Sequence, residues 1–193
     1  MLAITGAGAS TLLAATPATR TITINPVTAG DRLSPGYRVT QTFHGGTCEA
    51  GSDVLSGVYR CFARNYVIDP CWPDHSAAPK PLVDCVLEPW SHAVTRIYLT
   101  HPLAASPGGP RQIWGLALDD GQRCLALQGA HSGFGGGRYV VNFGCTSSLG
   151  LVNEPDRSRR SWTIREARVR GTREILGPAV AIATVWYGSP SHR

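Results

Sequence analysis

The sequence predicts a mostly β fold, a compact antiparallel sandwich or barrel-like domain with three disulfides. Three observations support this prediction. Glycine (22 residues) and proline (14 residues) are abundant, which suits short strands joined by many turns. Apolar and polar residues alternate along several short segments, as they do in a strand with one buried face. The cysteines number six, and no two of them form a C-x-x-C pair.

Length and composition favour one folded domain with a real core. The chain has 193 residues, of which 42% are hydrophobic and 16% are charged, so it is not disordered by composition. The predicted division is a signal peptide or its remnant at 1–18, a lead-in at 19–36, a single disulfide-stapled β-rich domain at 37–187, and a tail at 188–193.

The N-terminus resembles a secretory signal. Small and apolar residues run through Ala15, and Thr16-Pro17-Ala18 follows as a cleavage site, although the usual basic n-region is absent. No later stretch approaches the ~20 apolar residues of a membrane span, so we expect no transmembrane segment in the mature chain. The protein is therefore expected to be secreted or extracytoplasmic.

Alternating patterns and turn residues place the strands. In chain order we expect strands near 37–43, 58–63, 66–68, 95–99, 113–118, 123–127, 139–145, 162–164 and 179–186. A turn is expected at Gly45-Gly46, and the Pro/Gly-rich segment 103–111 is the best linker candidate. Residues 161–174 suit a short helix as well as a strand.

Two hairpins stand out among these elements. Asp119-Asp120-Gly121 lies between two apolar runs, and Asp-Gly favours a two-residue turn in which both central residues have positive φ. A second hairpin is expected to join 124–128 to 139–145 across the glycines at 133–137. We interpret this glycine run as a flexible hairpin tip rather than a phosphate loop, because no Gly-Lys-Ser/Thr follows it.

The wide cysteine spacing indicates structural disulfides in an oxidising compartment rather than zinc or redox sites. Six cysteines allow fifteen connectivities, and six buried free thiols are the alternative. We favour sequential pairing, in which each bond closes a local hairpin or loop and contributes about 2–4 kcal/mol. The expected pairs are Cys48–Cys61, Cys71–Cys85 and Cys124–Cys145.

Several short motifs combine cysteine, tryptophan and turn residues. They are Ile68-Asp69-Pro70-Cys71-Trp72, Cys85 through Glu88-Pro89-Trp90, Trp114 through Gly121 to Cys124, Asn142-Phe143-Gly144-Cys145 and Trp162-Thr163-Ile164. This six-cysteine, tryptophan-rich pattern resembles small exported proteins of actinobacteria that have no assigned activity. The resemblance covers roughly Tyr37 to Tyr187 and implies fold and export. It carries no catalytic residue.

No catalytic constellation emerges from the sequence. Ser132 lies in a segment like a nucleophile elbow, but Ala130 and Phe134 stand where the elbow needs glycine. Glycosidase chemistry needs two carboxylates across a cleft, and the acids not explained by turns or prolines, such as Asp53, Asp74 and Asp84, are expected in loops near cysteines. The histidines have no metal-ligand spacing, so we expect no metal and no cofactor. They are His44, His75, His92, His101, His131 and His192.

Two features suggest binding. The formal net charge is +5, and guanidinium groups pair well with phosphate or carboxylate. The candidate anion-binding residues are Arg157, Arg159, Arg160, Arg165 and Arg168, and Arg170 and Arg173 follow closely. The alternative is a solvated basic edge strand, because only part of this set can share one face. Trp72, Trp90 and Trp114 suit either a sugar-binding platform or, more simply, core packing beside the cystines.

These observations favour an exported, non-catalytic binding or cell-envelope-associated domain, with an anionic envelope polymer as its candidate partner. The alternative is a small exported hydrolase with an unrecognised active site. A deep pocket that gathers two or more titratable side chains would favour the hydrolase.

Overall fold

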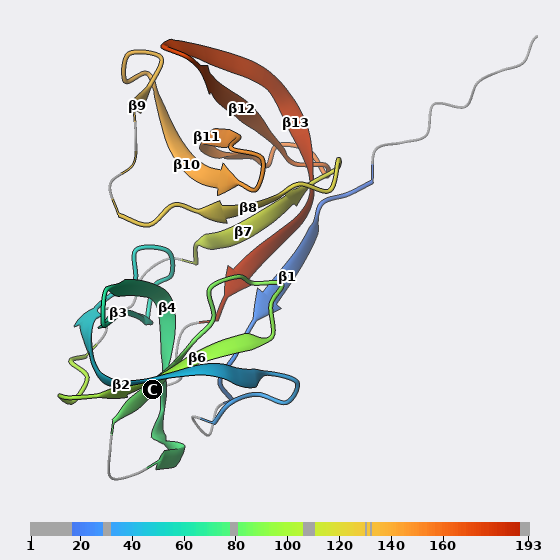
Figure 1. Cartoon of the computed structure of the whole chain (residues 1–193). Coiled ribbons are helices and arrows are strands. Elements are labelled where there is room, and N and C mark those ends of the chain that lie inside the picture. Colours follow the sequence, from blue (N-terminus) through green and yellow to red (C-terminus); the bar gives the residue numbers. More distant parts are fainter. Residues whose placement is uncertain are drawn as a thin grey trace, which may run out of the picture.

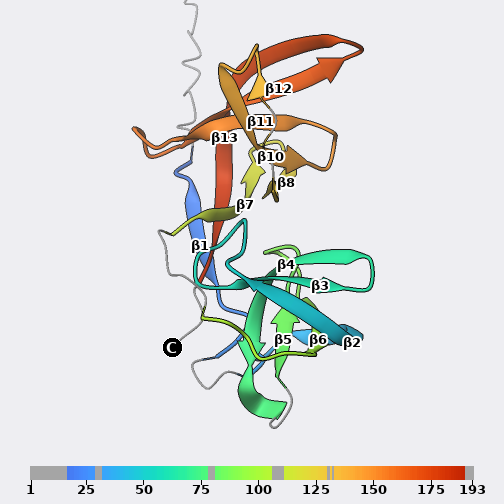
Figure 2. The same ribbon diagram turned by 90° about the vertical axis from the view of Figure 1, so that its left-hand side faces the viewer.

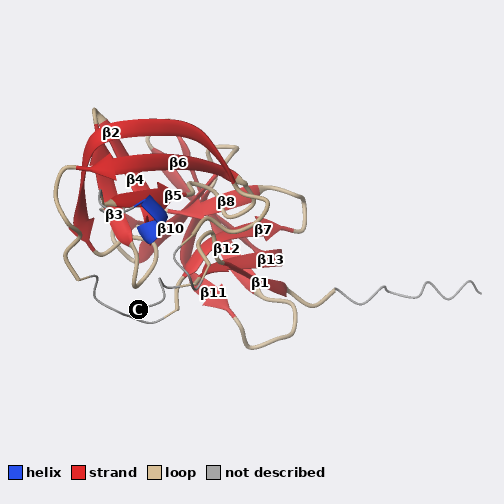
Figure 3. Ribbon diagram, turned by 90° about the horizontal axis from the view of Figure 1, so that it is seen from below, coloured by secondary structure: helices blue, strands red, loops and turns tan. Residues whose placement is uncertain are grey.

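The structure is a computed structural model, and it describes residues 17–28, 32–77, 81–105, 111–129, 131 and 133–189. Strands dominate these residues, whose one helical turn is the 3-10 helix η1 (His75–Ala77) (Figure 3). The predicted mostly β, barrel-like fold is confirmed. Most of the predicted signal peptide and tail lies outside the described residues. Within the described part of the chain, no helix is long and apolar enough to cross a membrane.

A first barrel consists of five strands that follow one another along the chain (Figure 1). They are β2 (Arg38–Ala50), β3 (Tyr59–Ala63), β4 (Tyr66–Asp74), β5 (Leu82–Cys85) and β6 (Ala93–Leu99). Each strand pairs antiparallel with the next, and β2 also pairs in parallel with β6. This last pairing closes the barrel.

A second ring of strands follows. It contains β7 (Ile113–Leu118), β8 (Arg123–Ala126), β10 (Tyr139–Cys145), β11 (Gly150–Asp156), β12 (Thr163–Arg170) and β13 (Arg173–Gly188). The long β13 pairs with β12 through its N-terminal half and with β7 through its C-terminal half, which completes the ring. The short β9 (Gly133–Phe134) pairs with β10, and β1 (Arg20–Ile24) lies parallel to the end of β13. In Figure 2 the two barrels are stacked, with β1 and β13 running between them.

The glycine pair after Phe43 does not form the predicted turn. Instead β2 continues to Ala50, with a bulge at Gly45 (φ +85°) where the register against β6 shifts. A Cβ on Gly46 would lie 2.3 Å from Cγ2 of Ile97 on β6, so only glycine permits this close approach. The glycines therefore bend a strand that pairs with β6 first and with β3 afterwards.

Other strand boundaries also differ from the prediction. The predicted lead-in contains β1, and β5 and β11 were not predicted at all. Both β4 and β13 are longer than expected, because the extra residues of β4 pair with the next strand, β5, and those at the start of β13 pair with the preceding strand, β12. Residues 163–174 form two strands joined by a turn rather than a helix. The linker candidate 103–111 does connect β6 to β7, but 106–110 lie outside the described residues.

The hairpin at Asp119 is confirmed, but its turn type is different. The carbonyl oxygen of Leu118 accepts a hydrogen bond from the N–H of Gly121, and the N–H of Leu118 donates to Gln122 O. Of the loop residues, only Gly121 has positive φ (86°). This is the three-residue loop that combines a type I turn with a left-handed glycine, rather than a two-residue turn.

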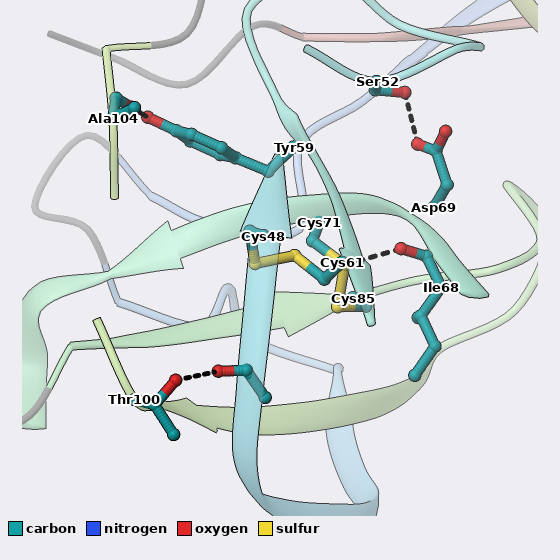
Figure 4. Close-up of a disulfide and its surroundings, with 11 residues drawn as sticks. Cys48, Ser52, Tyr59, Cys61, Ile68, Asp69, Cys71, Cys85, Thr100 and Ala104 are labelled. Carbon is teal, nitrogen blue, oxygen red and sulfur yellow. Dashed lines mark hydrogen bonds between the residues drawn. A yellow bond between two sulfur atoms is a disulfide. The ribbon is translucent and has the colours of Figure 1, made fainter. Parts of the chain in front are cut away.

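The three predicted disulfides are confirmed. Each joins residues that lie directly opposite one another on neighbouring strands, namely Cys48–Cys61 (β2–β3), Cys71–Cys85 (β4–β5) and Cys124–Cys145 (β8–β10). The two bonds of the first barrel lie close together (Figure 4). Because each bond fixes a cross-strand pair, each also fixes the register of its two strands.

Each barrel has its own apolar core, and a third core lies between the barrels. In this third core Trp72 of β4 packs against Trp114 of β7, with ring centroids 5.6 Å apart. Both side chains are buried, and Val58 and Val94 of the first barrel join them, as do Leu125 and Ala126 of the second. The two barrels are therefore held together by apolar contact, which matches the core-packing interpretation of these tryptophans.

A charged triad is buried in the first barrel. The guanidinium of Arg96 (β6) donates to both carboxylate oxygens of Asp84 (2.8 Å each) and to Asp74 (2.9 Å). Burial raises the pKa of Asp84. Burial alone would do the same to Asp74, but hydrogen bonds from Ser76 and the charge of Arg96 lower its pKa overall. The prediction that these two acids lie in loops is wrong: both are on strands, and one cation joins them.

Replacing Arg96 by methionine should destabilise the protein by roughly 3–5 kcal/mol, because two buried carboxylates would lose their cation. Chemical denaturation of the oxidised variant measures this change. Arg168→Met, which breaks an ion pair with an exposed arginine, is the control and should cost no more than about 1 kcal/mol. Equal losses in the two variants would contradict a structural role for the triad.

Candidate functional site

The structure divides the predicted arginine cluster between the two ends of β12. Arg157, Arg159 and Arg160 lie in the connection between β11 and β12, and we call them the turn group. Their segment is fixed against the start of β1, because the N–H of Thr19 donates to Arg160 O (2.9 Å). Arg165 and Arg168 lie on β12 itself. All five side chains are exposed.

Beyond the last pairing with β11, strands β12 and β13 continue as a two-stranded hairpin that extends from the second barrel (Figure 1). Arg168 lies opposite Ile175 and Arg170 opposite Arg173, so these side chains share one face of the hairpin. Arg165 is three residues from Arg168 on the same strand, so its side chain lies on the opposite face. We call Arg168, Arg170 and Arg173 the hairpin group.

The hairpin group carries excess positive charge. Among the described residues, Glu166 pairs with Arg168 (3.4 Å), but no acid pairs with Arg170 or Arg173. The neighbouring Glu174 lies on the other face, where it accepts a hydrogen bond from the N–H of Gly135. Like charges directly opposite each other on two strands repel. An anion bound at this face would relieve that repulsion.

A cavity of about 380 Å³ lies between the two barrels. The first barrel contributes the segment after β2, and the second contributes the ends of β7, β8 and β11 and the middle of β10. The polar side chains among its described lining are Asp53, Arg111, Gln112, His131, Asn142, Glu154 and Arg157. Residues from five distant parts of the sequence thus meet here, which no local pattern could indicate.

Partners beside the cavity hold several of these side chains in place. Asp53 pairs with Arg60 (2.6 Å). Nδ1 of His131 donates to Val141 O (3.0 Å), which orients the imidazole ring. Glu154 accepts a hydrogen bond from Asn142 (3.4 Å). These contacts restrain Asp53 and His131, whereas the Glu154 side chain is mostly exposed.

The cavity meets the condition that favours a hydrolase, since Asp53, His131 and Glu154 all line it. Its described lining has no serine, threonine or cysteine. The carboxylates and the imidazole there suit acid–base catalysis or binding. Among the described residues, the one group of three side chains whose metal-ligand atoms lie within 4.8 Å of one another is Cys61, Cys71 and Cys85. Their sulfurs are in disulfides and are not thiolates.

A buried carboxyl group lies beside the cavity at Asp69, a residue that sequence reasoning explained only by the proline after it. Ser52 Oγ donates to one carboxylate oxygen (Figure 4), and the N–H of Asp53 donates to the other (2.8 Å). Burial is the main reason that the pKa of Asp69 rises to about 6, and these hydrogen bonds partly oppose it. Its backbone carbonyl accepts from Gln128 Nε2 (2.8 Å), which links the barrels.

Asp69 should make the protein less stable as pH rises from about 4 to 6. Its pKa is raised from 3.8 to about 6 on folding, so in this window the folded state binds more protons than the unfolded state. The contribution lost by pH 7 is at most about 3 kcal/mol. In Asp69→Asn the free energy of unfolding should therefore fall less between pH 4 and pH 7 than in the wild type.

Urea unfolding at both pH values measures this difference. Asp119→Asn, a change at an exposed turn carboxyl, should leave the wild-type pH dependence intact. An Asp69→Asn variant with the same pH dependence as the wild type would contradict the assignment.

The other candidates that the structure describes do not line the cavity. Ser132 and His192 are outside the described residues. The imidazole of His44 stacks on Tyr98, with ring centroids 4.8 Å apart, and that of His92 packs against Tyr37, with ring centroids 5.1 Å apart. Trp90 packs against Trp186, so it forms no platform with the buried Trp72 and Trp114. The glycines at 135–137 form the turn between β9 and β10, as expected of a hairpin tip.

In comparisons with known proteins, no family model matches the chain, and neither a curated protein nor a solved structure matches it.

Proposed function

We propose that the protein is an exported, non-catalytic binding domain that holds a linear anionic polymer of the cell envelope. The observation that carries this proposal is the direct opposition of Arg170 and Arg173 on the exposed hairpin. The two residues face each other on the paired strands, and among the described residues neither has an acidic partner. A chain of phosphates or carboxylates would neutralise both.

The charge distribution supports a long ligand rather than a single ion. Residues 111–189 contain ten arginines and six acids, whereas residues 32–105 contain six basic and six acidic residues. The turn group and the hairpin group lie at opposite ends of β12, about 23 Å apart at ~3.3 Å per residue. A polymer that follows β12 would reach both groups, whereas Arg165 lies on the opposite face of the strand.

The disulfides support export. Three disulfides are consistent with an oxidising compartment, and the N-terminal pattern of small and apolar residues supports a secretory signal. The resemblance to exported actinobacterial proteins points to the same location.

Neutralising the hairpin group should weaken polyanion binding and reduce its dependence on salt. We expect the oxidised protein to be retained on immobilised polyphosphate and on cell-wall fractions at low salt and released at high salt. In the triple variant R168Q/R170Q/R173Q, the slope of log K against log salt concentration should decrease by about 2 in magnitude.

The matched control is R32Q/R38Q/R64Q, which removes three exposed arginines that precede β7. It has the same net charge as the hairpin variant and should retain most of the wild-type salt slope. The proposal is wrong if the wild type is not retained at low salt. It is also wrong if the two triple variants lose the same amount of the salt slope.

A second candidate is a small exported hydrolase that acts at the cavity, and the gathering of Asp53, His131 and Glu154 there favours it. This candidate predicts measurable hydrolysis of p-nitrophenyl glycosides or esters, with loss of the activity in Glu154→Gln. Turnover no faster than the buffer rate across these substrates would eliminate it.

A further inference from the structure

We propose that the cavity between the barrels binds a sugar acid, that is, a single hydroxyl-rich ring that carries one carboxylate. The inference uses only the lining of the cavity, so it does not depend on polymer binding by the basic groups. It also needs no catalytic step.

Arg111 supplies the group that would recognise the carboxylate. Its guanidinium carbon lies 4.1 Å from the centre of the Tyr187 ring, and Nη2 donates to the hydroxyl of Thr23. These two contacts fix the guanidinium plane, yet no acid pairs with Arg111 among the described residues. A guanidinium has five N–H donors in a planar fork, and this geometry matches the two oxygens of a carboxylate.

The remaining polar side chains suit hydroxyl groups. Glu154 and Asp53 offer carboxylate oxygens that accept from hydroxyls, and Asn142 offers both a donor and an acceptor. In the neutral ring that donates through Nδ1, Nε2 of His131 adds an acceptor. Arg60 holds Asp53 and the carbonyl of Val141 holds His131, so a ligand loses little entropy in ordering these two side chains.

The apolar part of the lining and the cavity volume agree with one ring. Val54, Ile113 and Phe143 are buried residues that line the cavity and would contact the C–H faces of a sugar. A volume of about 380 Å³ is near the lower end of the range for small-molecule sites. The site therefore suits a monosaccharide better than an extended chain.

Titration calorimetry with glucuronate, glucose and acetate tests the proposal. Glucuronate should bind saturably and at least about tenfold more tightly than glucose, which lacks the carboxylate, or acetate, which lacks the ring. Arg111→Met should weaken glucuronate binding by about ten- to a hundredfold, the loss expected for charge-assisted hydrogen bonds. Glu154→Gln should weaken both glucuronate and glucose binding.

The matched control is Arg138→Met, at an exposed arginine that is not part of the lining, and it should bind as the wild type does. Amide chemical shifts in the same titrations report whether each variant is folded and whether the ligand perturbs the lining. The proposal is wrong if glucuronate produces no saturable binding up to about 10 mM, well above a millimolar dissociation constant. It is also wrong if Arg111→Met binds as tightly as Arg138→Met.

Discussion

Three cross-strand disulfides constrain the rest of this structure. Each joins two cysteines that lie directly opposite one another on neighbouring strands, so a slip of one residue would break the covalent pair. Short strands specify register weakly, and a slip would turn every inward side chain outward. The bond between β2 and β3 also closes the segment that contains Ser52 and Asp53, and thereby positions one wall of the cavity.

The packing of the two barrels creates the candidate site. Trp72 and Trp114 fill the core between them, while Gln128 and Asp69 link the barrels through a hydrogen bond at the edge of that core. The cavity lies beside this junction, where apolar packing gives way to charged groups. The basic groups lie at the two ends of β12, and only Arg157 belongs both to them and to the cavity lining.

Local features were predictable and non-local ones were not. Cysteine pairs 13, 14 and 21 residues apart, and the turn at Gly121, are encoded within short windows of sequence. The bulge at Gly45 depends on the approach of β6, and the second partner of β13 is a strand more than fifty residues earlier. Arg165 and Arg168 lie on opposite faces because they are three residues apart on a strand. The sequence left both a helix and a strand open here, so it could not assign these faces. Nothing near Asp69 in the sequence indicates its burial.

The most direct test of this account is peptide mapping of the protein recovered from outside the cell and alkylated without reduction. The account predicts that every cysteine is protected, and that digestion yields linked peptides for Cys48–Cys61, Cys71–Cys85 and Cys124–Cys145. An alkylated cysteine in the folded protein, or a linkage such as Cys61–Cys71, would contradict it.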